Sequence, residues 1–463
     1  MEIILKNIAK IKEAHVKIRG ITVIAGENDT GKSTISKALF SMFHGFYHLD
    51  EKIRCDRRKN LASLLHRTAT NEGKLNYSHR ITISLSTSNF NSSPNVTMNY
   101  FEEMAKDLLE SFTQSDMNDN SAMNNESLSL KLKDFFKEKY NEVFSDDLIT
   151  TMIPKVVDLI NVSSLEIGNM ILSQTMNIEF YNQINSLGST NEGRISLTIK
   201  QKTNTVTLRA NRVIKIDEEI PIETDVIYFD NPFLIDQIPV TFLHLVKPEE
   251  ISFHNMGHQE WLIWNLQNKL KYPYLDRMMS QISDNSATRE IIVERHLKKI
   301  YEKLNLVCQG IVTSNNRVMN EWIYRLGDSE GIFLKNLSTG LKTFVILKAL
   351  LQNGTLTYGS TLILDEPEIH LHPKWQLILA ELIVLLNKEF QVHVLLNTHS
   401  PYFLRAIEVY SQKHGIDEEC DYYLARLEGD TSEIKNVNHC IEEIYKKLWI
   451  PFQKLEDEVS SDE

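Results

Sequence analysis

Cysteine is scarce in this sequence, and its placement excludes one kind of architecture. The four cysteines are scattered without C-x-x-C spacing, at Cys55, Cys308, Cys420 and Cys440. This spacing argues against a disulfide framework and against a zinc hook, and it suits the reducing cytoplasm, where we expect the protein. A long apolar run is also lacking: no stretch reaches the roughly eighteen residues of a transmembrane helix, so we expect no membrane segment. The opening residues, MEIILKNIAK, lack a signal-peptide pattern and are predicted to form a strand.

Positive charge is in deficit as well. The formal net charge of −12 disfavours global attraction to nucleic acid. A local basic patch is not excluded by the net charge and could contact DNA. The candidates are KIRCDRRK at 52–59 and TREIIVERHLKKIYEK at 288–303. Such runs are more often the solvated face of a helix.

Sustained heptads are lacking too, so we expect a compact helical lobe or short stalk rather than long coiled-coil arms.

What the sequence does contain is VIAGENDTGKSTISKAL, residues 23–39, which fits the P-loop pattern G-x-x-x-x-G-K-[ST]. The apolar run Ile21 to Ala25 predicts a buried strand before the loop, and Thr34 to Phe40 predicts the start of a helix after it. Phosphates need this context, because N–H groups of the loop and of the helix N-terminus converge on one anion. A chance match in a glycine-containing turn would lack it. The sequence therefore predicts a nucleoside triphosphate site.

The residue types of the loop suit that chemistry. Glycines permit close backbone approach, Lys32 is expected to reach the β- and γ-phosphates, and Ser33 is expected to offer its hydroxyl to Mg²⁺. The residues predicted to contact ATP are Gly26, Glu27, Asn28, Asp29, Thr30, Gly31, Lys32, Ser33 and Thr34.

Two further segments near the other end of the chain carry related chemistry. STLILDEPEIHLHPKWQ (360–376) has an apolar run that ends at Asp365 and Glu366, and VHVLLNTHSPYF (392–403) has one that ends close to His399. Continuous apolar runs are typical of parallel strands buried on both faces. The carboxyl ends of such strands form the edge where α/β proteins bind ligands. A solvated strand end and a structural histidine are the alternatives for these residues.

More than three hundred residues separate the P-loop from these strands, so we predict an α/β nucleotide domain that is split by a large, mostly helical insertion. Residues 79–100 alternate like a hairpin, and 194–216 and 310–326 read as paired strands. Residues 101–185 read as mainly helical, with an interruption at Pro154. The expected organisation is an ATPase part with the P-loop at 1–50, a strand-rich remainder at 51–100, a helical insertion at 101–190, a strand-rich return at 191–255, a second helical segment at 256–308, the second ATPase part at 309–450 and an acidic disordered tail at 451–463.

The segment FLKNLSTGLKTFVILKALLQ comes just before the strand that ends at Asp365 and Glu366, and it bears on the type of ATPase. Ser338 and Gly340 open what reads as a helix, and a serine-glycine loop at a helix N-terminus is a second anion site. One interpretation is the signature motif of ABC-type ATPases, which contacts the γ-phosphate held by the opposite protomer. The other is an ordinary N-cap before a core helix.

Together these motifs resemble ABC-type ATPases related to the SMC proteins and the OLD family, and most of all the compact AAA_15/AAA_21-type ATPases of anti-phage systems. LSTG, LILDEPEIHLHP and NTHSPYFL carry the resemblance, which covers about the first fifty residues and 330–410, with a weaker match at DVIYFDNPFLID. The helical insertion is not covered. The resemblance departs at LSTGLK, where Lys342 stands in place of a common glutamine, and no clear Q-loop is found beyond the weak candidate Gln237.

The resemblance implies roles for individual residues. Asp365 resembles the Walker B aspartate that holds Mg²⁺ with Ser33, Glu366 resembles the general base, and His399 resembles the switch histidine at the γ-phosphate. His372 falls in the region that meets the partner protomer. A zinc site around that histidine is not expected, because the order E-x-E-x-H-x-H differs from the H-E-x-x-H helix pattern.

The resemblance also implies partners. If the signature loop acts in trans, the active unit is at least a dimer of this chain with two sandwiched ATP molecules. Only about sixty residues follow His399, which leaves no room for the Toprim nuclease of an OLD-type protein. We therefore expect a sensor and scaffold ATPase that controls a separate Toprim or HNH nuclease, as in PARIS, which is slightly favoured, or Septu, with a phage protein as trigger. A DNA-repair or DNA-clamping ATPase is the main alternative, and a nuclease site inside the insertion is a third.

Overall fold

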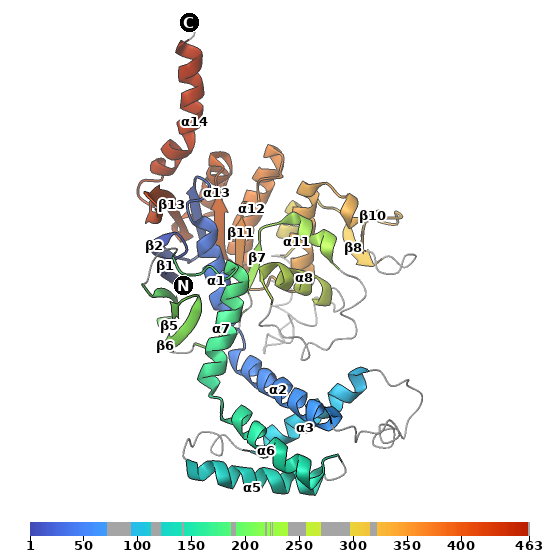
Figure 1. Ribbon diagram of the computed structural model, residues 1–463. Helices are drawn as coiled ribbons and strands as arrows, with labels where there is room; N and C mark the ends of the chain where they lie inside the picture. Colours follow the sequence, from blue (N-terminus) through green and yellow to red (C-terminus); the bar gives the residue numbers. More distant parts are fainter. Residues whose placement is uncertain are drawn as a thin grey trace. The chain divides into compact units, whose positions relative to one another are not determined.

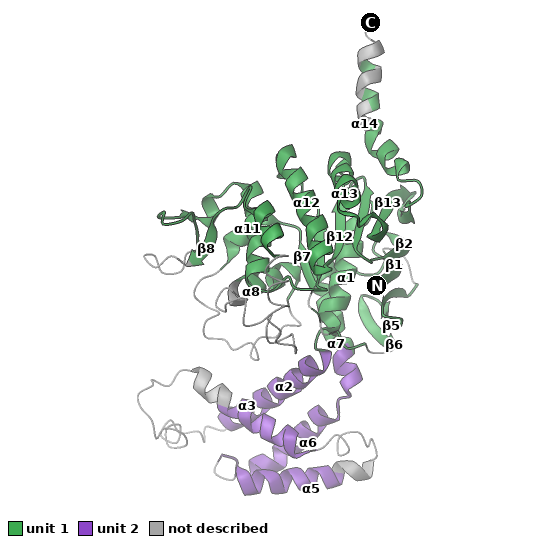
Figure 2. Cartoon of the chain, turned by 180° about the vertical axis from the view of Figure 1, so that it is seen from behind, with its two compact units in different colours: residues 1–48, 169–463 green, residues 49–168 purple. Residues whose placement is uncertain are grey.

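The computed structural model describes the chain in two compact units, coloured separately in Figure 2. Unit 1 comprises Met1–His48 and Asn169–Glu463, and unit 2 comprises Leu49–Gly168. The described residues are all except 72–93, 113–121, 141–142, 187–190, 218–219, 223, 225, 239–255, 270–296, 315–321 and 462–463.

Unit 1 is built on a mixed sheet with the strand order β6-β5-β4-β1-β2-β14-β13-β3-β12-β11-β7 among the described residues. Its strands are β1 (Glu2–Ile8), β2 (Ile11–Lys17), β3 (Ile21–Gly26), β4 (Gly193–Ile199), β5 (Lys202–Arg209), β6 (Arg212–Asp217), β7 (Val226–Phe229), β11 (Thr361–Asp365), β12 (His393–Thr398), β13 (Cys420–Glu428) and β14 (Thr431–Asn436). The α/β prediction is confirmed.

One half of this sheet is parallel and brings the distant motifs together. Strands β13, β3, β12, β11 and β7 run parallel in that order. Every residue of β3 is buried, and so are all of β7 and most of β11 and β12, which explains their continuous apolar sequences. The β3 strand comes from the start of the chain and its neighbour β12 from residues near 400, so the sheet is assembled across the insertion, as predicted.

Helices cover this parallel region (Figure 1). The bounds in unit 1 are α1 (Lys32–Phe46), α8 (His258–Lys269), α11 (Thr339–Gln352), α12 (Pro373–Phe390), α13 (Pro401–His414) and α14 (Glu442–Ser461), with α7 (Ser164–Phe180) entering from unit 2. Helix α1 packs against β3, β12, β11 and β7, while α12 packs on β12 and beside α13. In α1, Ile35, Leu39, Met42 and Phe46 recur at helical spacing and are buried, which fixes the helix on the sheet.

Smaller strand pairs complete unit 1. Strands β4, β5 and β6 pair antiparallel, so the predicted pairing at 194–216 is confirmed. Strands β8 (Ile311–Ser314), β9 (Trp322–Arg325) and β10 (Ile332–Phe333) form a second sheet. The predicted pairing of the 310–326 hairpin is confirmed, and part of its turn lies outside the described residues. Short 3-10 segments lie at Pro232–Gln237 (η1), Leu334–Asn336 (η4) and Asp417–Glu419 (η5).

Unit 2 is helical. It contains α2 (Leu49–Asn71), α3 (Pro94–Ser111), α5 (Ala122–Lys139) and α6 (Asp146–Asn161), together with the first residues of α7. Its core is a cluster of apolar side chains that includes Leu65, Leu108, Phe136 and Met152. The prediction that residues 101–185 are mainly helical is confirmed.

The structure corrects two expectations about this region. The stretch 51–100 was expected to be rich in strands, but its described part lies in α2 and α3, and residues 94–100 are helical rather than part of a hairpin. The cause is burial: Phe101, Ala105, Leu108 and Phe112 recur at helical spacing and are all buried. Residues 79–93 lie outside the described part. Pro154 does not interrupt the helix but sits inside α6, whose flanking apolar side chains are buried against the other helices.

A third correction concerns the tail. Residues 451–463 were expected to be disordered, but α14 continues to Ser461. The helix is anchored at its start, where Ile444 is buried and Glu443 forms an ion pair with Lys435. Acidic side chains in the first turn are favourable at a helix N-terminus, and a docked first turn removes the cost of nucleation for the rest.

The second helical segment, 256–308, is partly described: α8 and residues 297–304 are helical, and 270–296 lie outside the described part. Within the described ranges no single helix has the length and apolar character to cross a membrane, although α6 and α7, bent by 73° at their junction, pass that test as a pair.

Candidate functional site

The loop between β3 and α1 has the geometry of an anion cradle. Gly31, directly before α1, adopts a left-handed conformation with φ of 82°, and no side chain caps the helix N-terminus. The Thr30 hydroxyl donates to the Glu27 carbonyl over 2.8 Å and closes the loop. A Cβ at Gly26 would lie 2.3 Å from the Ala425 carbonyl oxygen, so only glycine fits beside β13. The loop therefore presents backbone N–H groups at a helix N-terminus, as a phosphate requires.

Lys32 begins α1 and is almost fully buried. Its Nζ donates to the carbonyls of Gly26 at 3.0 Å and Glu27 at 2.8 Å. The same Nζ lies 3.8 Å from Glu366 Oε1. Burial lowers the pKa of Lys32, and the nearby acidic side chains, Glu366 foremost, oppose that shift. The ammonium group is thus held between the loop and the acidic end of β11.

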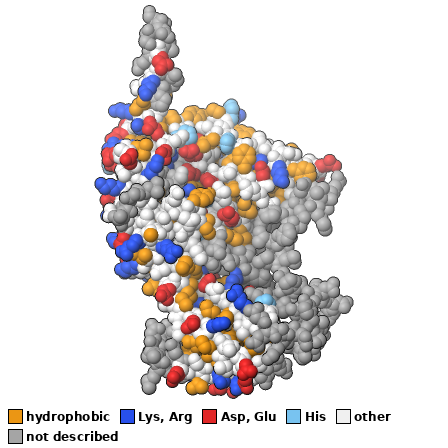
Figure 3. Space-filling view, viewed as in Figure 1, with side chains coloured by type: hydrophobic (Ala, Val, Ile, Leu, Met, Phe, Trp, Pro, Cys, Tyr) orange, Lys and Arg blue, Asp and Glu red, His pale blue; other side chains and the backbone are white. Residues whose placement is uncertain are grey.

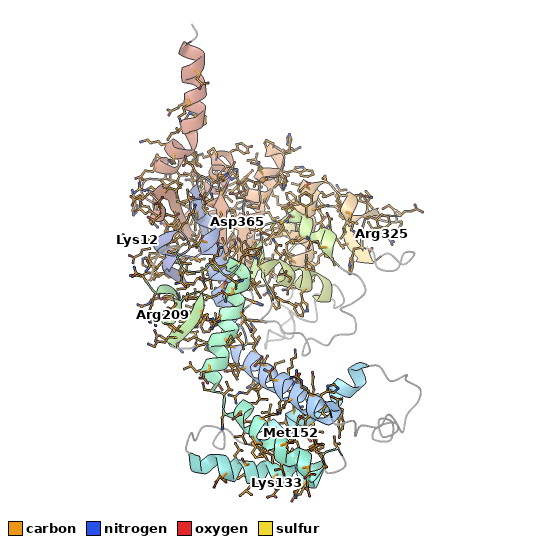
Figure 4. The ribbon with its side chains drawn as sticks, viewed as in Figure 1. Lys12, Lys133, Met152, Arg209, Arg325 and Asp365 are labelled. Carbon is orange, nitrogen blue, oxygen red and sulfur yellow. The ribbon has the colours of Figure 1, made fainter. Side chains whose placement is uncertain are left out.

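Asp365 ends β11 at the edge of the sheet and is held on both carboxylate oxygens (Figure 4 labels it). Asn397, its partner in the register of β12, donates from Nδ2 to Asp365 Oδ1 over 3.0 Å. Tyr228 on β7 donates its hydroxyl to Asp365 Oδ2 over 2.9 Å. Asn397 Nδ2 also donates to the Ser36 hydroxyl of α1 over 2.8 Å, which ties the carboxylate to the P-loop helix.

Glu366 and His399 lie close together at this edge of the sheet. Glu366 adopts a positive φ of 51°, and its N–H donates to the Asn397 carbonyl over 3.0 Å. Its Oε1 lies 3.2 Å from His399 Nδ1, without the alignment of a hydrogen bond. A left-handed conformation is costly for a residue with a side chain and recurs at functional sites. The structure therefore brings together Lys32, Asp365, Glu366 and His399, which the sequence places in three distant segments.

The Mg²⁺ prediction fits the residues at this edge. Ser33 is exposed in the first turn of α1, and Asp365 retains lone pairs on both oxygens besides the hydrogen bonds that it accepts. Hydroxyl and carboxylate oxygens are ligands that Mg²⁺ prefers, and it usually takes few from the protein and the rest from water and phosphates. Among the described residues, no group of three or more His, Cys, Asp or Glu has metal-binding geometry.

Several residues of this site are not among those predicted from the sequence. Glu368 is buried, and the Thr398 hydroxyl donates to its Oε1, while burial raises the pKa of the Glu368 carboxyl. Thr398 Oγ1 in turn accepts from the N–H of Ser400 over 3.0 Å, so Glu368 helps to fix the turn that carries His399. Its position as the third acid of DEPE, after Asp365 and Glu366, was the available signal. Tyr228 lies in the weakly matching DVIYFDNPFLID and Asn397 in NTHSPYFL, but neither motif indicates a bond to Asp365. Strand register brings these two to Asp365, and the packing of α1 brings Ser36 to Asn397.

The end of β7 lies next to the end of β11. Phe229 is in register with Leu364, so the next residue, Asp230, falls beside Asp365 at the sheet edge. Asp230 accepts hydrogen bonds from His258 and Gln259 of α8. Gln237, the weak Q-loop candidate, instead ends η1 with an exposed side chain.

Ser338 and Gly340 lie at the start of α11. Ser338 occupies the N-cap position, but its side chain makes no capping hydrogen bond. In the described part of the chain, no hydrogen bond or ion pair joins either residue to the P-loop or to Glu366. Lys342, two residues after Gly340 in α11, is buried. Its Nζ forms an ion pair with Asp236 Oδ2 of η1 at 2.6 Å. This ion pair holds α11 to the segment after β7.

The two histidines beside this loop have structural contacts. His372 caps α12 by accepting from the N–H of Lys374 at 3.2 Å, and the His370 ring packs edge-on against Phe233.

Comparisons with known proteins indicate the family of the chain. The model of the AAA ATPase domain family (AAA_15) matches residues 1–404. The Retron Vc95 probable ATPase of Vibrio cholerae serotype O1 biovar El Tor is 31% identical over 183 residues, which cover 35% of this chain and 34% of that protein. The Septu protein PtuA of Bacillus thuringiensis is 29% identical over 110 residues, covering 21% of this chain and 27% of that protein. The matched segments thus span about a third or less of these relatives.

Solved structures were also compared. An SMC head bound to the C-winged helix domain of ScpA aligns over 94% of this chain and 96% of its own, with a TM-score of 0.38 and 11% identity. The SMC head domain from Thermotoga maritima aligns over 94% of this chain and 98% of its own, with a TM-score of 0.35 and 10% identity. At these TM-scores the likeness carries no conclusion about function. The family match covers most of the chain, including the P-loop and the segment with Asp365, Glu366 and His399, and the chain belongs to the AAA ATPase domain family.

Proposed function

We propose that this chain binds ATP with Mg²⁺ and hydrolyses it. The observation that carries the proposal is the meeting of Lys32, Glu366 and His399 beside the P-loop: Glu366 Oε1 lies 3.8 Å from Lys32 Nζ and 3.2 Å from His399 Nδ1. Phosphoryl transfer requires mainly positioning and charge stabilisation, and a lysine, carboxylates and a histidine around one phosphate cradle supply both.

Each residue has a distinct role in this proposal. Lys32 neutralises charge on the β- and γ-phosphates, and Ser33 and Asp365 hold the metal. When bound, Mg²⁺ neutralises charge that develops on the phosphates. Glu366 orients the attacking water and accepts its proton, and His399 contacts the γ-phosphate.

The active unit proposed is a pair of chains with ATP at their interface. Ser338 and Gly340 open α11 without a capping bond from the Ser338 side chain, which suits an anion supplied by a second copy. In that arrangement the P-loop of one chain and the Ser338 loop of the other enclose one triphosphate. Binding then favours the closed pair, and hydrolysis resets it.

We further propose that the pair is the sensor and scaffold of an anti-phage complex in the cytoplasm, and that it controls a separate effector. The support is the similarity to an ATPase of a retron and to a Septu protein. The effector proposed is a Toprim nuclease, as in PARIS, or an HNH nuclease, as in Septu, with a phage-encoded trigger.

The alternative of DNA clamping gains no support from the described basic residues. In the stretch 52–59, Lys52 is buried in α2 and Arg57 donates to the carbonyls of Ile160 and Val162 at 3.5 and 2.6 Å. On the face drawn in Figure 3, Lys and Arg side chains are interspersed with Asp and Glu. Most of the second basic stretch, 288–303, lies outside the described residues.

A catalytic variant tests the dimer and the general base together. Glu366→Gln keeps the size of the side chain but removes the base, so ATP binding should persist while turnover falls by about 10²–10⁴-fold. Light scattering coupled to gel filtration should then show a dimer with ATP and Mg²⁺. The double variant Glu366→Gln/Ser338→Arg is the control: it should still bind ATP but stay monomeric. A Glu366→Gln protein that binds ATP and remains monomeric would contradict the sandwich, and unchanged turnover would assign the base elsewhere.

The role in a complex has its own test. The chain should co-purify with the product of the adjacent open reading frame after nuclease treatment has removed DNA. Retention of DNA by the chain alone, in a manner that weakens with salt, would instead favour the clamping ATPase.

A further inference from the structure

A buried tyrosine lies behind the proposed metal carboxylate. Tyr228 comes from β7, within the segment DVIYFDNPFLID that matches the family only weakly, and its side chain is almost fully enclosed. Its hydroxyl donates to Asp365 Oδ2 over 2.9 Å, opposite the Asn397 amide on Oδ1 at 3.0 Å. The carboxylate therefore has one fixed donor on each oxygen, and the plane of the group is set by two neighbouring strands.

The tyrosine is itself held by a histidine. The His258 ring stacks on the Tyr228 ring with centroids 4.1 Å apart and planes inclined by 22°. The Phe40 ring of α1 meets His258 edge-on at 6.0 Å and lies 6.3 Å from Tyr228. Stacked and edge-on contacts of this kind fix ring orientation as well as adding stability. The Tyr228 ring is thus confined on one side by α8 and on another by α1.

Two carboxylates fix the histidine in turn. His258 Nδ1 lies 2.8 Å from Glu179 Oε2, and Nε2 lies 3.0 Å from Asp230 Oδ2. The backbone N–H of His258 donates to the other Glu179 oxygen over 2.5 Å. Gln259 Nε2 also donates to Asp230, at 3.2 Å. Both ring nitrogens are therefore engaged, and the imidazole has one orientation rather than two.

We propose that Tyr228 and His258 are positioning residues for Asp365: the Glu179–His258–Asp230 arrangement holds the tyrosine ring, and the tyrosine hydroxyl aims the carboxylate at the metal of the bound nucleotide. The proposal rests on the proposed function, because it concerns the same site. Neither residue contacts the phosphates, and both act through Asp365. Residues that orient metal ligands in this way commonly contribute 10- to 100-fold to metal affinity.

A purely structural role would give a different picture. Tyr423, equally buried, uses its hydroxyl to accept from the backbone N–H of Lys17 at 2.8 Å, a bond that involves none of the proposed site residues. Loss of that bond would cost stability only. The Tyr228 hydroxyl donates instead to the Asp365 carboxylate. Loss of this hydrogen bond leaves the carboxylate without a fixed orientation, so metal binding changes as well as stability.

The test measures Mg²⁺-dependent nucleotide binding by the full chain. Fluorescent ATP is titrated in EDTA and then at increasing Mg²⁺ concentration, for wild type, Tyr228→Phe, His258→Gln and the control Tyr423→Phe. Tyr228→Phe keeps the ring and its stacking, so affinity in EDTA should be unchanged while the Mg²⁺ concentration at half-maximal effect rises roughly tenfold. His258→Gln should shift it in the same direction, and Tyr423→Phe should leave it at the wild-type value.

The outcomes separate the two proposals. If wild type binds ATP with Mg²⁺ but Tyr228→Phe and His258→Gln both keep the wild-type Mg²⁺ midpoint, the positioning role is wrong and the proposed ATP site stands. If wild type shows no Mg²⁺-dependent binding, the proposed function fails and the positioning role with it. His258→Gln decides the matter by itself if Tyr228→Phe does not fold, as judged by circular dichroism.

Discussion

The two units bury different kinds of side chain. Among the described residues of unit 2, Lys52 is the one buried polar or charged residue, and the rest of its core is apolar. Unit 1 buries many, and Lys32, Glu368, Asn397 and Thr398 lie together at the carboxyl edge of its parallel strands.

This contrast indicates which of the two units carries the chemistry. Burial of a polar or charged group costs free energy unless it is paired, so a fold keeps such groups where they perform a task. Hydrogen bonds at the edge of unit 1 offset the cost of burying these groups. Examples are the bonds of Asn397 with Asp365 and of Thr398 with Glu368. We infer that nucleotide chemistry belongs to unit 1, and that unit 2 contributes through its shape and surface.

The largest expected effect comes from the buried lysine of unit 1. Lys32→Ala removes the cation from the phosphate cradle and leaves the Gly26 and Glu27 carbonyls without their donor. ATP affinity, measured by isothermal titration, should fall at least about 100-fold, since a hydrogen bond to a charged group contributes roughly 1.5–3 kcal/mol and Lys32 also neutralises phosphate charge. Lys37→Ala, farther along the same helix, is the control and should bind ATP normally. Wild-type affinity in the Lys32 variant would remove the P-loop from the proposal.

How much of this site could be predicted from sequence depended on whether its residues formed a local pattern. Lys32, Asp365 and Glu366 stand in short motifs, and each strand that carries them is a continuous apolar run, so their meeting at one edge followed from parallel pairing. Tyr228 lies only in the weaker match DVIYFDNPFLID, and His258 lies in none of the quoted motifs. They reach the site through the register of β7 with β11 and the packing of α8, which are tertiary facts.

The errors in the fold have the same origin. Residues 94–100 carry polar and β-branched side chains that read as a turn and strand, but they form the first turns of a helix whose later residues, such as Phe101 and Leu108, are buried. Local propensity is weaker than that burial. The backbone chemistry of proline predicts an interruption at Pro154. The residues on either side of it, Met152 and Val156, are nevertheless buried and stabilise α6.

A core variant of unit 2 tests the separation of the units. Phe136 is fully buried among the helices, and Phe136→Ala should destabilise unit 2 by about 3–5 kcal/mol. All five tryptophans lie outside residues 49–168, so their fluorescence reports on unit 1, whereas far-ultraviolet circular dichroism reports on helices of both. We expect the variant to show an early urea transition by circular dichroism, an unchanged transition by fluorescence and unchanged ATP affinity.

The matched control is Leu130→Ala in the same helix, because that side chain is 64% exposed and should cost less than about 0.5 kcal/mol. A loss of ATP binding in Phe136→Ala, with circular dichroism unchanged at zero urea, would show that the units are not separable in this way.

The smallest effect expected concerns the buried ion pairs of unit 1, and its sign follows from the pKa of His258. Burial opposes protonation, but hydrogen bonds and charges from Asp230 and Glu179 outweigh it and raise the pKa of His258 from 6.5 to about 9. A group whose pKa is higher in the folded state stabilises the fold fully below its unfolded pKa, and this contribution is lost as pH rises through the folded pKa. The shift from 6.5 to about 9 corresponds to at most about 3 kcal/mol.

The prediction is therefore a pH-dependent loss of stability in unit 1. The free energy of unfolding, followed by tryptophan fluorescence in urea, should decrease between about pH 6.5 and pH 9, and His258→Gln should flatten that decrease. The groups that face the imidazole are the Glu179 and Asp230 carboxylates and the rings of Tyr228 and Phe40. Burial raises the pKa of Tyr228, and, although burial opposes it, the hydrogen bond with His258 helps to keep the pKa of Asp230 low, so we assign the slope to the histidine. His15→Gln is the control, since that side chain is 57% exposed and its pairing with Glu2 should contribute little. An equal slope in wild type and His258→Gln would mean that the imidazole is neutral in the folded chain, and the buried charge of unit 1 would then have to be assigned to other groups.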